Sequence, residues 1–597
     1  MRLCFSFLRH IKYLLGRRRS NIWIPLAAIA FVLPSLCAGL AGDDYFMRAV
    51  ALQNTDICCL PQSAFDLFAF VSGSTDPAVI RQGMATGLYP WWTHPHLTIA
   101  FFRPLASFTH WLDFRLGGDA VWLMHLHSLV WYALLVLTAG LLYQRFLSPF
   151  WTAGLATLLY ALDYNHSIGA ASLCNRNAVM AAVFGVLALL NHDRWRRDNR
   201  KLCSIGAPIC FFLSLLSAEA GLATGGYLVA YALFLEKKKL FTGWVVLLPY
   251  VITACFWRTL YLAGGYGVAH SGVYTDPGND TLQFIIDLGK RLPVLLQAQL
   301  ALPPSDLWAV LPPTFALMYA LGAATVVLFI AWGMLPILRR DAAIRFFAAG
   351  MTLSAIPFCA TVPSNRFLFF IGIGCMAVIA RFLEMALEPA AWFLPYWRTT
   401  RKLLACVWII LWLFISPLLL ALLSLSPRAV QKPLTLAAET IAPRDGKSSP
   451  EHVVVVNIPS DLMLFYVPFI RAASGQGTHL HPVLLSAGSM PIAVQRVNDR
   501  TLVIRYLDDG LLTGLWNQVF RDAAELIQQD VPLKLTHCSV MVTSVNQVGL
   551  PSEITFAFAV PLEDESLAWV IWSEQGFIPF IPPATGATVL IKPARPL

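Results

Sequence analysis

Long apolar segments alternate with short polar and basic segments over roughly the first two thirds of the chain. A helix of about 20 apolar residues crosses a hydrocarbon core of roughly 30 Å, and segments of this kind recur between residues 21 and 424. The predicted spans cover residues 21–41, 121–143, 150–166, 174–191, 202–218, 220–235, 241–262, 309–335, 346–362, 366–383 and 403–424. This pattern predicts a mainly α fold, a polytopic helical membrane bundle of about eleven spans.

After residue 424 the pattern changes to one of short alternating segments. Residues 425–450 are rich in polar residues and proline, and they predict a linker. Residues 451–597 predict a small β-rich domain, because "HVVVVNIP", "LKLTHCSVMVTSV", "SEITFAFAV" and "LAWVIW" are typical of strands. "PIAVQRV" and "RTLVIRY" predict a hairpin around an Asn498-Asp499 turn, and "DLMLFYVPFIRAA" predicts a helix.

The positions of lysine and arginine predict the topology of the bundle. Cytoplasmic loops carry an excess of these residues, and the clusters in residues 1–20, 144–145, 194–201, 236–239, 339–345 and 398–402 all fall on one side. The basic N-terminus is then cytoplasmic, and an odd number of spans puts the C-terminal domain in the periplasm or outside the cell. The first apolar segment is too long for a cleaved signal peptide, so we expect it to remain as an anchor.

Two long segments, residues 42–120 and 263–308, lie on the predicted outer side. Each contains helical patterns expected to lie along the membrane interface, including "TLQFIIDLGKRLPVLLQAQL". Aromatic residues in the first segment are expected to anchor it at the level of the lipid headgroups. These residues are Trp91, Trp92, Phe101, Phe102 and Trp111.

Composition agrees with a membrane protein and excludes a nucleic-acid-binding function. The 597 residues are 57% hydrophobic and 13% charged, with a mean hydropathy of +0.62. The net charge of +9 belongs to the loops that set the topology. No basic stripe interleaved with aromatic residues is present, so we expect membrane lipids as partners and no DNA or RNA. The pattern fits a multi-pass membrane protein.

An acidic pair, Asp43 and Asp44, follows directly on the first span. The pair stands in a fixed order with "FFRPLASFTHWLDFRLGG", "LMHLHSLVWYALLVLTAGLLYQRF", "LDYNHSIGAASLCNRNAVMAAVFGVLALL", "SLLSAEAGLATGGYLVAY" and "VPSNRFLFFIGIG". Over residues 20 to 385 this order resembles the GT-C superfamily of polytopic glycosyltransferases, and in particular bacterial members related to the protein O-mannosyltransferases. The resemblance implies a polyprenyl-phosphate-linked sugar donor, transfer on the periplasmic or luminal face, and an acidic catalytic base in the first outer loop.

The residues themselves fit that chemistry. A carboxylate at Asp43 or Asp44 can take the proton of an acceptor hydroxyl that attacks an anomeric carbon. The departing lipid phosphate needs fixed cations, and the planar guanidinium fork of arginine suits phosphate oxygens. The candidates at outer span ends are Arg103, Arg176, Arg258, Lys290, Arg291 and Arg366. Glu219, in "AEAG", is a further candidate, at a turn where the superfamily often has an acid. The lipid, glycan or protein acceptor and the sugar are not specified by the sequence.

Other interpretations stay open for these residues. Asp43 and Asp44 could end a helix and face water, Arg176 and Arg366 could anchor helix ends, and Arg258 could pair with Glu219. "AEAG" lacks the lysine, and "LDYNHSIG" the proline, that are common in the superfamily. A transporter or a non-catalytic scaffold of the cell envelope is therefore an alternative, although transporters place such residues near the bilayer midplane.

No metal site is expected from the sequence. The outer histidines show no closed set at zinc spacing, and a polar loop that contains His479 and His481 is expected to be solvated. These outer histidines are His94, His96, His110, His125 and His127. A divalent cation at the active site stays open, because members of the superfamily differ in metal dependence and the Asp43–Asp44 pair is a weak signal. Cys58 and Cys59 are adjacent, and no cysteine spacing predicts a set of disulfides.

Overall fold

The chain forms two compact units. The computed structural model describes residues 12–17, 19–61, 63–72, 76–236, 240–387, 397–442, 452–478, 480–488 and 490–594. A helical unit contains the residues up to 40, 102–261 and 277–427. A mixed unit contains residues 41–101, 262–276 and 428–597.

The helical unit holds the predicted spans, and each of the eleven coincides with a helix. Among the described residues, eight helical segments are long and apolar enough to cross a membrane, and Phe150–Ala161 and Leu202–Ser217 are shorter apolar helices. The helices are α2 (Ser20–Val32), α5 (Pro104–Gly117), α6 (Val121–Phe146), α7 (Phe150–Ala161), α8 (Ser167–Ala171), α9 (Arg176–Asp198), α10 (Leu202–Ser217), α11 (Ala223–Phe234), α12 (Leu240–Val245), α13 (Leu248–Ala263), α14 (Thr281–Leu300), α15 (Pro313–Leu338), α16 (Ala342–Ser354), α17 (Leu368–Leu387), α18 (Trp397–Ile409) and α19 (Ser416–Leu423). The chain is an integral membrane protein, as its composition predicts.

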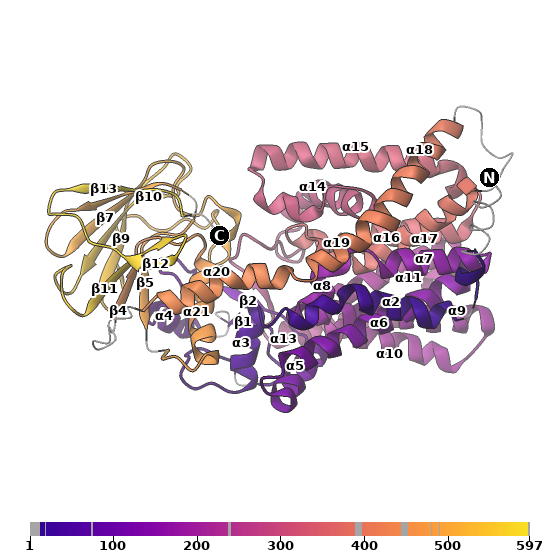
Figure 1. The fold of residues 1–597 in the computed structure, drawn as a ribbon, viewed down its shortest axis with the longest axis horizontal. Coiled ribbons are helices and arrows are strands. Elements are labelled where there is room, and N and C mark those ends of the chain that lie inside the picture. Colours follow the sequence, from indigo (N-terminus) through magenta and orange to yellow (C-terminus); the bar gives the residue numbers. More distant parts are fainter. Residues whose placement is uncertain are drawn as a thin grey trace. The chain divides into compact units, whose positions relative to one another are not determined.

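The centre of the helical unit is α17, with α16 and α11 beside it (Figure 1). Close contact is possible because glycines face large side chains: a Cβ at Gly350 of α16 would lie 2.2 Å from the Tyr227 ring of α11. The Tyr227 hydroxyl donates to the Phe370 carbonyl of α17 at 2.7 Å. In contrast, α15 leaves Phe315 and Leu328 more than half exposed. An exposed apolar face of this kind is expected to contact lipid.

The described residues of the mixed unit form three sheets. Strands β1 (Ala69–Ser72), β2 (Thr98–Ala100) and β3 (Gly267–Ala269) form an antiparallel sheet in that order. A six-stranded antiparallel sheet has the order β13 (Thr588–Ile591), β6 (Ile492–Arg496), β7 (Thr501–Tyr506), β10 (Pro551–Phe558), β9 (Cys538–Val545) and β8 (Leu533–Lys534). The third sheet has the order β12 (Gly576–Pro579), β11 (Leu567–Ser573), β4 (His452–Val455) and β5 (His481–Leu484), and β4 is parallel to β11 and β5.

The predicted β-rich domain is confirmed, with additions. The hairpin β6–β7 and the helix α21 (Asp461–Ala473) lie where the sequence predicts them. Strands β5, β12 and β13 were not predicted, because each is only four residues long and carries little alternation. Residues 426–440, expected to belong to a linker, form the helix α20 (Ser426–Thr440), and residues 443–450 of that predicted linker lie outside the described part of the chain.

Both outer segments take part in the core of the mixed unit. Phe46, on α3 (Asp43–Ala51), packs edge-on against Phe469 of α21 with ring centroids 5.4 Å apart. The sheet β1–β2–β3 joins the first outer segment to the second. Trp91, Trp92 and Phe101 are 6%, 1% and 9% exposed, so the structure corrects their assignment as headgroup anchors. They pack inside the protein because the C-terminal residues cover them; Trp91, for instance, meets Phe556 of β10.

A buried acid in this core gives a testable prediction. Asp461 begins α21 and is 1% exposed, and desolvation raises the pKa of its carboxyl from 3.8 to about 7. Burial therefore favours the protonated form of the Asp461 carboxyl. The stability that the protein has with this carboxyl protonated is complete below pH 4 and is lost as the pH rises through 7. We expect Asp461→Asn to increase the free energy of unfolding at pH 8 on the order of 1–3 kcal/mol, which raises the unfolding temperature. At pH 4 the substitution should have little effect.

Differential scanning fluorimetry in detergent at both pH values measures this. The matched control is Asp508→Asn, at an exposed position of the same unit, which should not change the pH dependence. A stabilisation by Asp461→Asn of the same size at pH 4 and pH 8 would contradict the assignment.

Candidate functional site

The acidic pair that follows the first span lies in the mixed unit, at the first turn of α3. Two carboxylates in the first turn of a helix are favourable, because the backbone N–H groups there carry partial positive charge. Asp44 is 1% exposed, and its Oδ2 accepts a hydrogen bond from the Ala41 backbone N–H at 3.0 Å. Asp43 is half-buried, and its Oδ1 accepts a hydrogen bond from the Tyr466 hydroxyl at 2.5 Å. The two carboxylates therefore differ: Asp44 is inside the protein, and Asp43 has a partly accessible side chain held by a tyrosine.

The basic candidates lie in the helical unit, and one of them, Arg366, lies on a short 3₁₀ turn at a helix end. Further turns of this kind lie near the others. These turns are η2 (Tyr164–His166), η4 (Glu219–Leu222), η6 (Ile356–Ala360) and η7 (Asn365–Phe367). Turn η2 contacts η7, and η4 contacts η6. The turns lie at the helix ends that the charge pattern assigns to the outer side, so polar side chains from distant parts of the sequence come together there.

Two of the basic candidates, Arg103 and Arg291, form ion pairs with carboxylates of the same unit. Arg103 donates from Nε to Glu219 Oε2 at 2.8 Å, so the partner of Glu219 is Arg103 and not Arg258. Arg291, on α14, donates to the Cys359 carbonyl of η6 at 2.9 Å and pairs with Asp287 at 3.0 Å. Both pairs fix the guanidinium groups at the end of the bundle and supply local positive charge balanced by a carboxylate.

Arg366, on η7, differs from these arginines. Its Nε atom is buried and has no hydrogen-bond partner within the described part of the chain, and its guanidinium lies 4.9 Å from the centre of the Phe367 ring. The turn itself is held firmly, since Asn365 accepts hydrogen bonds from the Ser305 backbone and hydroxyl. A buried arginine N–H without an acceptor is costly, and an anionic ligand would satisfy it.

Arg176 is engaged by the protein. It is 1% exposed, and its guanidinium donates to the Ser128 hydroxyl at 2.9 Å, to the Met124 carbonyl at 2.8 Å and to the Asp113 carboxylate. A phosphate would have to displace these acceptors. The geometry favours the alternative that Arg176 fixes the start of α9 against α5 and α6, while its predicted role in phosphate binding stays a prediction.

Arg258 and Lys290 are the remaining predicted cations. Arg258 is half-buried on α13, with its guanidinium 5.2 Å from the Tyr261 ring centre. Lys290 is half-buried on α14, one residue before Arg291. The Glu219 carboxylate binds Arg103, and neither Arg258 nor Lys290 forms an ion pair with it.

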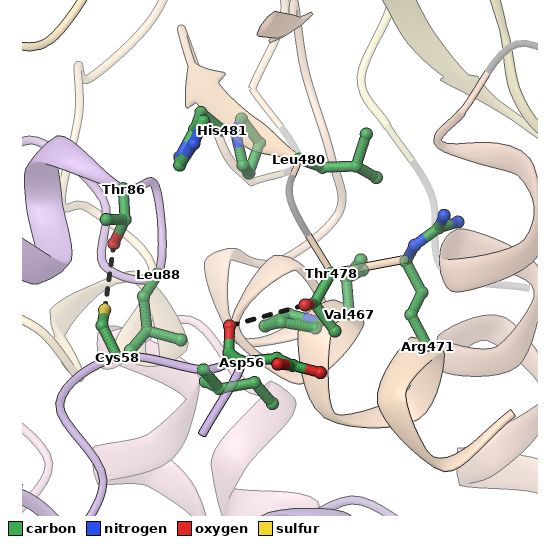
Figure 2. Close-up of a pocket in the computed structure, with 12 residues that line it drawn as sticks. Asp56, Cys58, Thr86, Leu88, Val467, Arg471, Thr478, Leu480 and His481 are labelled. Carbon is green, nitrogen blue, oxygen red and sulfur yellow. Dashed lines mark hydrogen bonds between the residues drawn. The ribbon is translucent and has the colours of Figure 1, made fainter. Parts of the chain in front are cut away.

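The mixed unit contains a small pocket of about 100 Å³ (Figure 2). Its walls come from the first outer segment and from α21 with the loop to β5, and they include Asp56, Cys58, Thr86, Arg471 and His481. The Thr478 hydroxyl donates to the Asp56 carbonyl at 3.4 Å and ties the two walls together. Of the two histidines expected to be solvated, His481 lines this pocket, and His479 lies outside the described residues.

Cys58 lies at this pocket with an activated thiol. Cys59 donates a hydrogen bond from its Sγ to Cys58 Sγ at 3.1 Å, and this lowers the pKa of Cys58 to about 6 despite partial burial, while the same interaction raises the pKa of Cys59. Thr86 Oγ1 lies 3.2 Å from Cys58 Sγ. Because the thiolate is the nucleophile, Cys58 should react with electrophiles at neutral pH.

We expect iodoacetamide to modify Cys58 about 10-fold faster than Cys59 at pH 7, and the reaction of Cys58 to slow as the pH falls through 6. Peptide mass spectrometry after timed labelling of the purified protein measures both rates. Cys59→Ser keeps a hydroxyl donor and should preserve the reaction, whereas Cys59→Ala should slow it. Equal rates for the two cysteines would refute the assigned hydrogen-bond direction.

Several solved structures resemble the chain, and ArnT and AftD are two of them. ArnT from Cupriavidus metallidurans, solved bound to undecaprenyl phosphate, matches 78% of this chain and 90% of its own, with 14% identity and a TM-score of 0.36. The arabinofuranosyltransferase AftD from Mycobacteria matches 92% of this chain with 13% identity and a TM-score of 0.33, and this chain spans 42% of that longer protein. No protein-family model matches the sequence, and the comparison with curated proteins gives no match.

Neither structural match bears on the relation to protein O-mannosyltransferases. With identities below 25% and TM-scores below 0.5, they transfer no residue role and no activity to this chain. The roles of individual residues have to be argued from this structure alone.

Some residues of the candidate site could not be found from the sequence. Tyr466, the hydrogen-bond partner of Asp43, follows it by 423 residues. Asp113, the partner of Arg176, is one acid in the amphipathic pattern of α5 and carries no signal of its own. A pattern of spans predicts which helix ends share a face of the membrane, and it does not predict which side chains meet there.

Proposed function

We propose that the chain transfers a sugar from a polyprenyl-phosphate donor to a hydroxyl of a lipid, glycan or protein acceptor on the outer face of a bacterial inner membrane. In this reaction the acceptor oxygen attacks the anomeric carbon of the donor. The bond between that carbon and the phosphate oxygen breaks, the carboxylate base takes the hydroxyl proton, and the polyprenyl phosphate leaves. No redox partner is required.

The observation that carries the proposal is the state of Arg366. Its buried Nε lacks a hydrogen-bond acceptor within the described chain, on a rigid turn at an end of the membrane helices. A lipid phosphate would supply the missing acceptor and would reach this depth, because its polyprenyl chain stays among the apolar helices. Arg103 and Arg291 lie on elements of the same end, but the carboxylates of Glu219 and Asp287 balance their charge, so the proposal rests on Arg366.

Asp43 is the better base of the acidic pair. A base has to reach the acceptor hydroxyl, and the half-buried Asp43 satisfies this condition, whereas Asp44 is 1% exposed and holds the Ala41 backbone. The hydrogen bond from Tyr466 orients the Asp43 carboxylate. Tyr466 is therefore a positioning residue in this proposal.

Mass spectrometry of the cell envelope tests the proposed function. A strain that lacks the protein is complemented with the wild-type chain, with Arg366→Gln or with the matched control Arg115→Gln, an exposed arginine of the same unit. We expect one sugar-bearing lipid, glycan or protein to disappear from the deletion strain and to return with wild type and Arg115→Gln. With Arg366→Gln, a reduction of about 10-fold or more is expected.

Three results would overturn parts of the proposal. An unchanged envelope, with expression verified in the parent strain, would favour a transporter or a scaffold. Full restoration by Arg366→Gln would exclude this arginine from phosphate binding. Loss with Arg115→Gln as well would show that the assay reports on folding, and purified protein with defined polyprenyl-phosphate sugars would then decide between the two variants.

A further inference from the structure

Two histidines and a glutamate meet in the mixed unit, outside the residues assigned to sugar transfer. His94 belongs to the first outer segment, His270 follows β3 in the second, and Glu525 belongs to the C-terminal region. Each offers one ligand atom, and the three atoms lie within 4.8 Å of one another. We propose that His94, His270 and Glu525 form a binding site for a divalent transition metal, with Zn²⁺ as the best fit.

The contacts among the three side chains favour this assignment. His270 Nδ1 lies 2.6 Å from Glu525 Oε1, and His94 Nε2 lies 3.4 Å from Glu525 Oε2. Oε2 is buried and accepts no hydrogen bond from the described residues. The two imidazole rings are stacked, with centroids 3.9 Å apart. The carboxylate is thus flanked by two ring nitrogens, and one of its oxygens still lacks a donor.

The ligand types select the metal. Two imidazole nitrogens and one carboxylate oxygen form a borderline-soft set that suits Zn²⁺ and disfavours Ca²⁺ and Mg²⁺, which prefer oxygen. A fourth position would be filled by water or by His96, whose ring centroid lies 6.0 Å from that of His94. If His94 Nε2 coordinates the metal, the proton of the neutral ring lies on Nδ1. Nδ1 can then no longer accept the hydrogen bond from the His96 backbone N–H, which lies at 3.2 Å, and this hydrogen bond would be lost.

The charges around the site set its expected affinity. Arg521 is a fixed cation beside the site, and its guanidinium donates to the Trp92 and Glu525 carbonyls. A dication beside this arginine is less favoured than in an acidic pocket, so we expect binding in the micromolar range and not a permanently occupied site.

The backbone around the ligands shows that they are held in place without the metal. The Asp522 N–H donates to the His270 carbonyl at 3.0 Å, and the His94 N–H donates to the Phe520 carbonyl at 3.0 Å. The three ligand-bearing segments are therefore already joined by main-chain hydrogen bonds. A bound metal would add a side-chain link between segments that are far apart in the sequence, and the mixed unit would gain stability in proportion to metal occupancy.

Metal content and thermal unfolding test the proposal on the full-length protein in detergent, purified through a tag that contains no histidine. After incubation with Zn²⁺ and removal of the excess, we expect about one more zinc per wild-type chain than in His94→Gln, His270→Gln or Glu525→Gln. The matched control Glu574→Gln, at an exposed acid, should keep the wild-type content. Zn²⁺ should raise the unfolding temperature of wild type and of the control, and EDTA should reverse the rise.

Cobalt provides a readout that does not depend on stability. Co²⁺ bound by wild type should give visible absorption bands of a low-symmetry site, and these bands should be absent from His270→Gln. Equal zinc in wild type and in all three ligand variants would overturn the proposal, as would the absence of bound zinc in wild type at millimolar Zn²⁺. Loss of zinc only in variants that also unfold at lower temperature in EDTA would overturn it too, because a folding defect would then explain the loss.

Discussion

Asp43→Asn is expected to reduce sugar transfer by about 10²–10⁴-fold while the protein still folds and inserts. The amide has nearly the same shape as the carboxylate and can still accept the hydrogen bond from Tyr466, but it cannot take a proton from the acceptor hydroxyl. General-base catalysis contributes about this factor to enzymatic rates. The measurement is the initial rate of polyprenyl phosphate release by purified protein, with the donor and acceptor identified from the cell envelope.

Two further variants decide whether the effect belongs to Asp43. Tyr466→Phe removes the donor that orients the carboxylate, and it should lower the rate by less, about 3- to 10-fold. Asp508→Asn, an exposed acid of the same unit, should leave the rate unchanged. If Asp44→Asn lowers the rate much more than Asp43→Asn, then the buried carboxylate is the base and our assignment within the pair is wrong.

Arg176→Met is expected to destabilise the protein by about 3–5 kcal/mol, the usual result of removing one partner of a buried ion pair. The substitution leaves the carboxylate of Asp113 with His127, whose Nδ1 lies 2.9 Å from Asp113 Oδ1, and without its guanidinium partner. It also removes the hydrogen bonds from Arg176 of α9 to Ser128 and Met124 of α6. Thermal unfolding in detergent measures the loss.

The double variant Arg176→Met/Asp113→Leu separates structure from phosphate binding. Replacing both partners removes the uncompensated buried charge, so the double variant should recover much of the stability lost by the single variant. If Arg176 is structural, transfer should recover with stability. A double variant that is as stable as wild type but inactive would instead return Arg176 to the phosphate site.

The membrane helices could be predicted because a span imposes a length and a composition on the sequence. Helix α15 is an example: lipid requires an unbroken apolar surface, and this requirement is visible in any stretch of the chain. A helix was also predicted at residues 281–300, where α14 lies, and in the structure the Asp280 side chain caps its first turn. These features depend on residues that are close together in the sequence.

The mixed unit could not be predicted in the same way, because its contacts are distant in sequence. Strand β3 pairs with β2 through three residues on each side, too few for a recognisable alternation, and the two strands are separated by more than 160 residues. The acidic pair was found because it follows a span, whereas the pairing of Glu219 with Arg103 instead of Arg258 depends on how α5 packs against α10. The cluster of His94, His270 and Glu525 shows no spacing in the sequence for the same reason.

The three-segment construction of the mixed unit has a consequence for biosynthesis. Residues 41–101 leave the ribosome about 330 residues before residue 428, the first of the C-terminal segment that completes their core. At ordinary rates of translation this interval lasts on the order of tens of seconds. During that time the apolar side chains of Phe46 and Trp92 lack their final covering. Until the last strands arrive, the nascent chain depends on lipid or on a chaperone to shield them from aggregation.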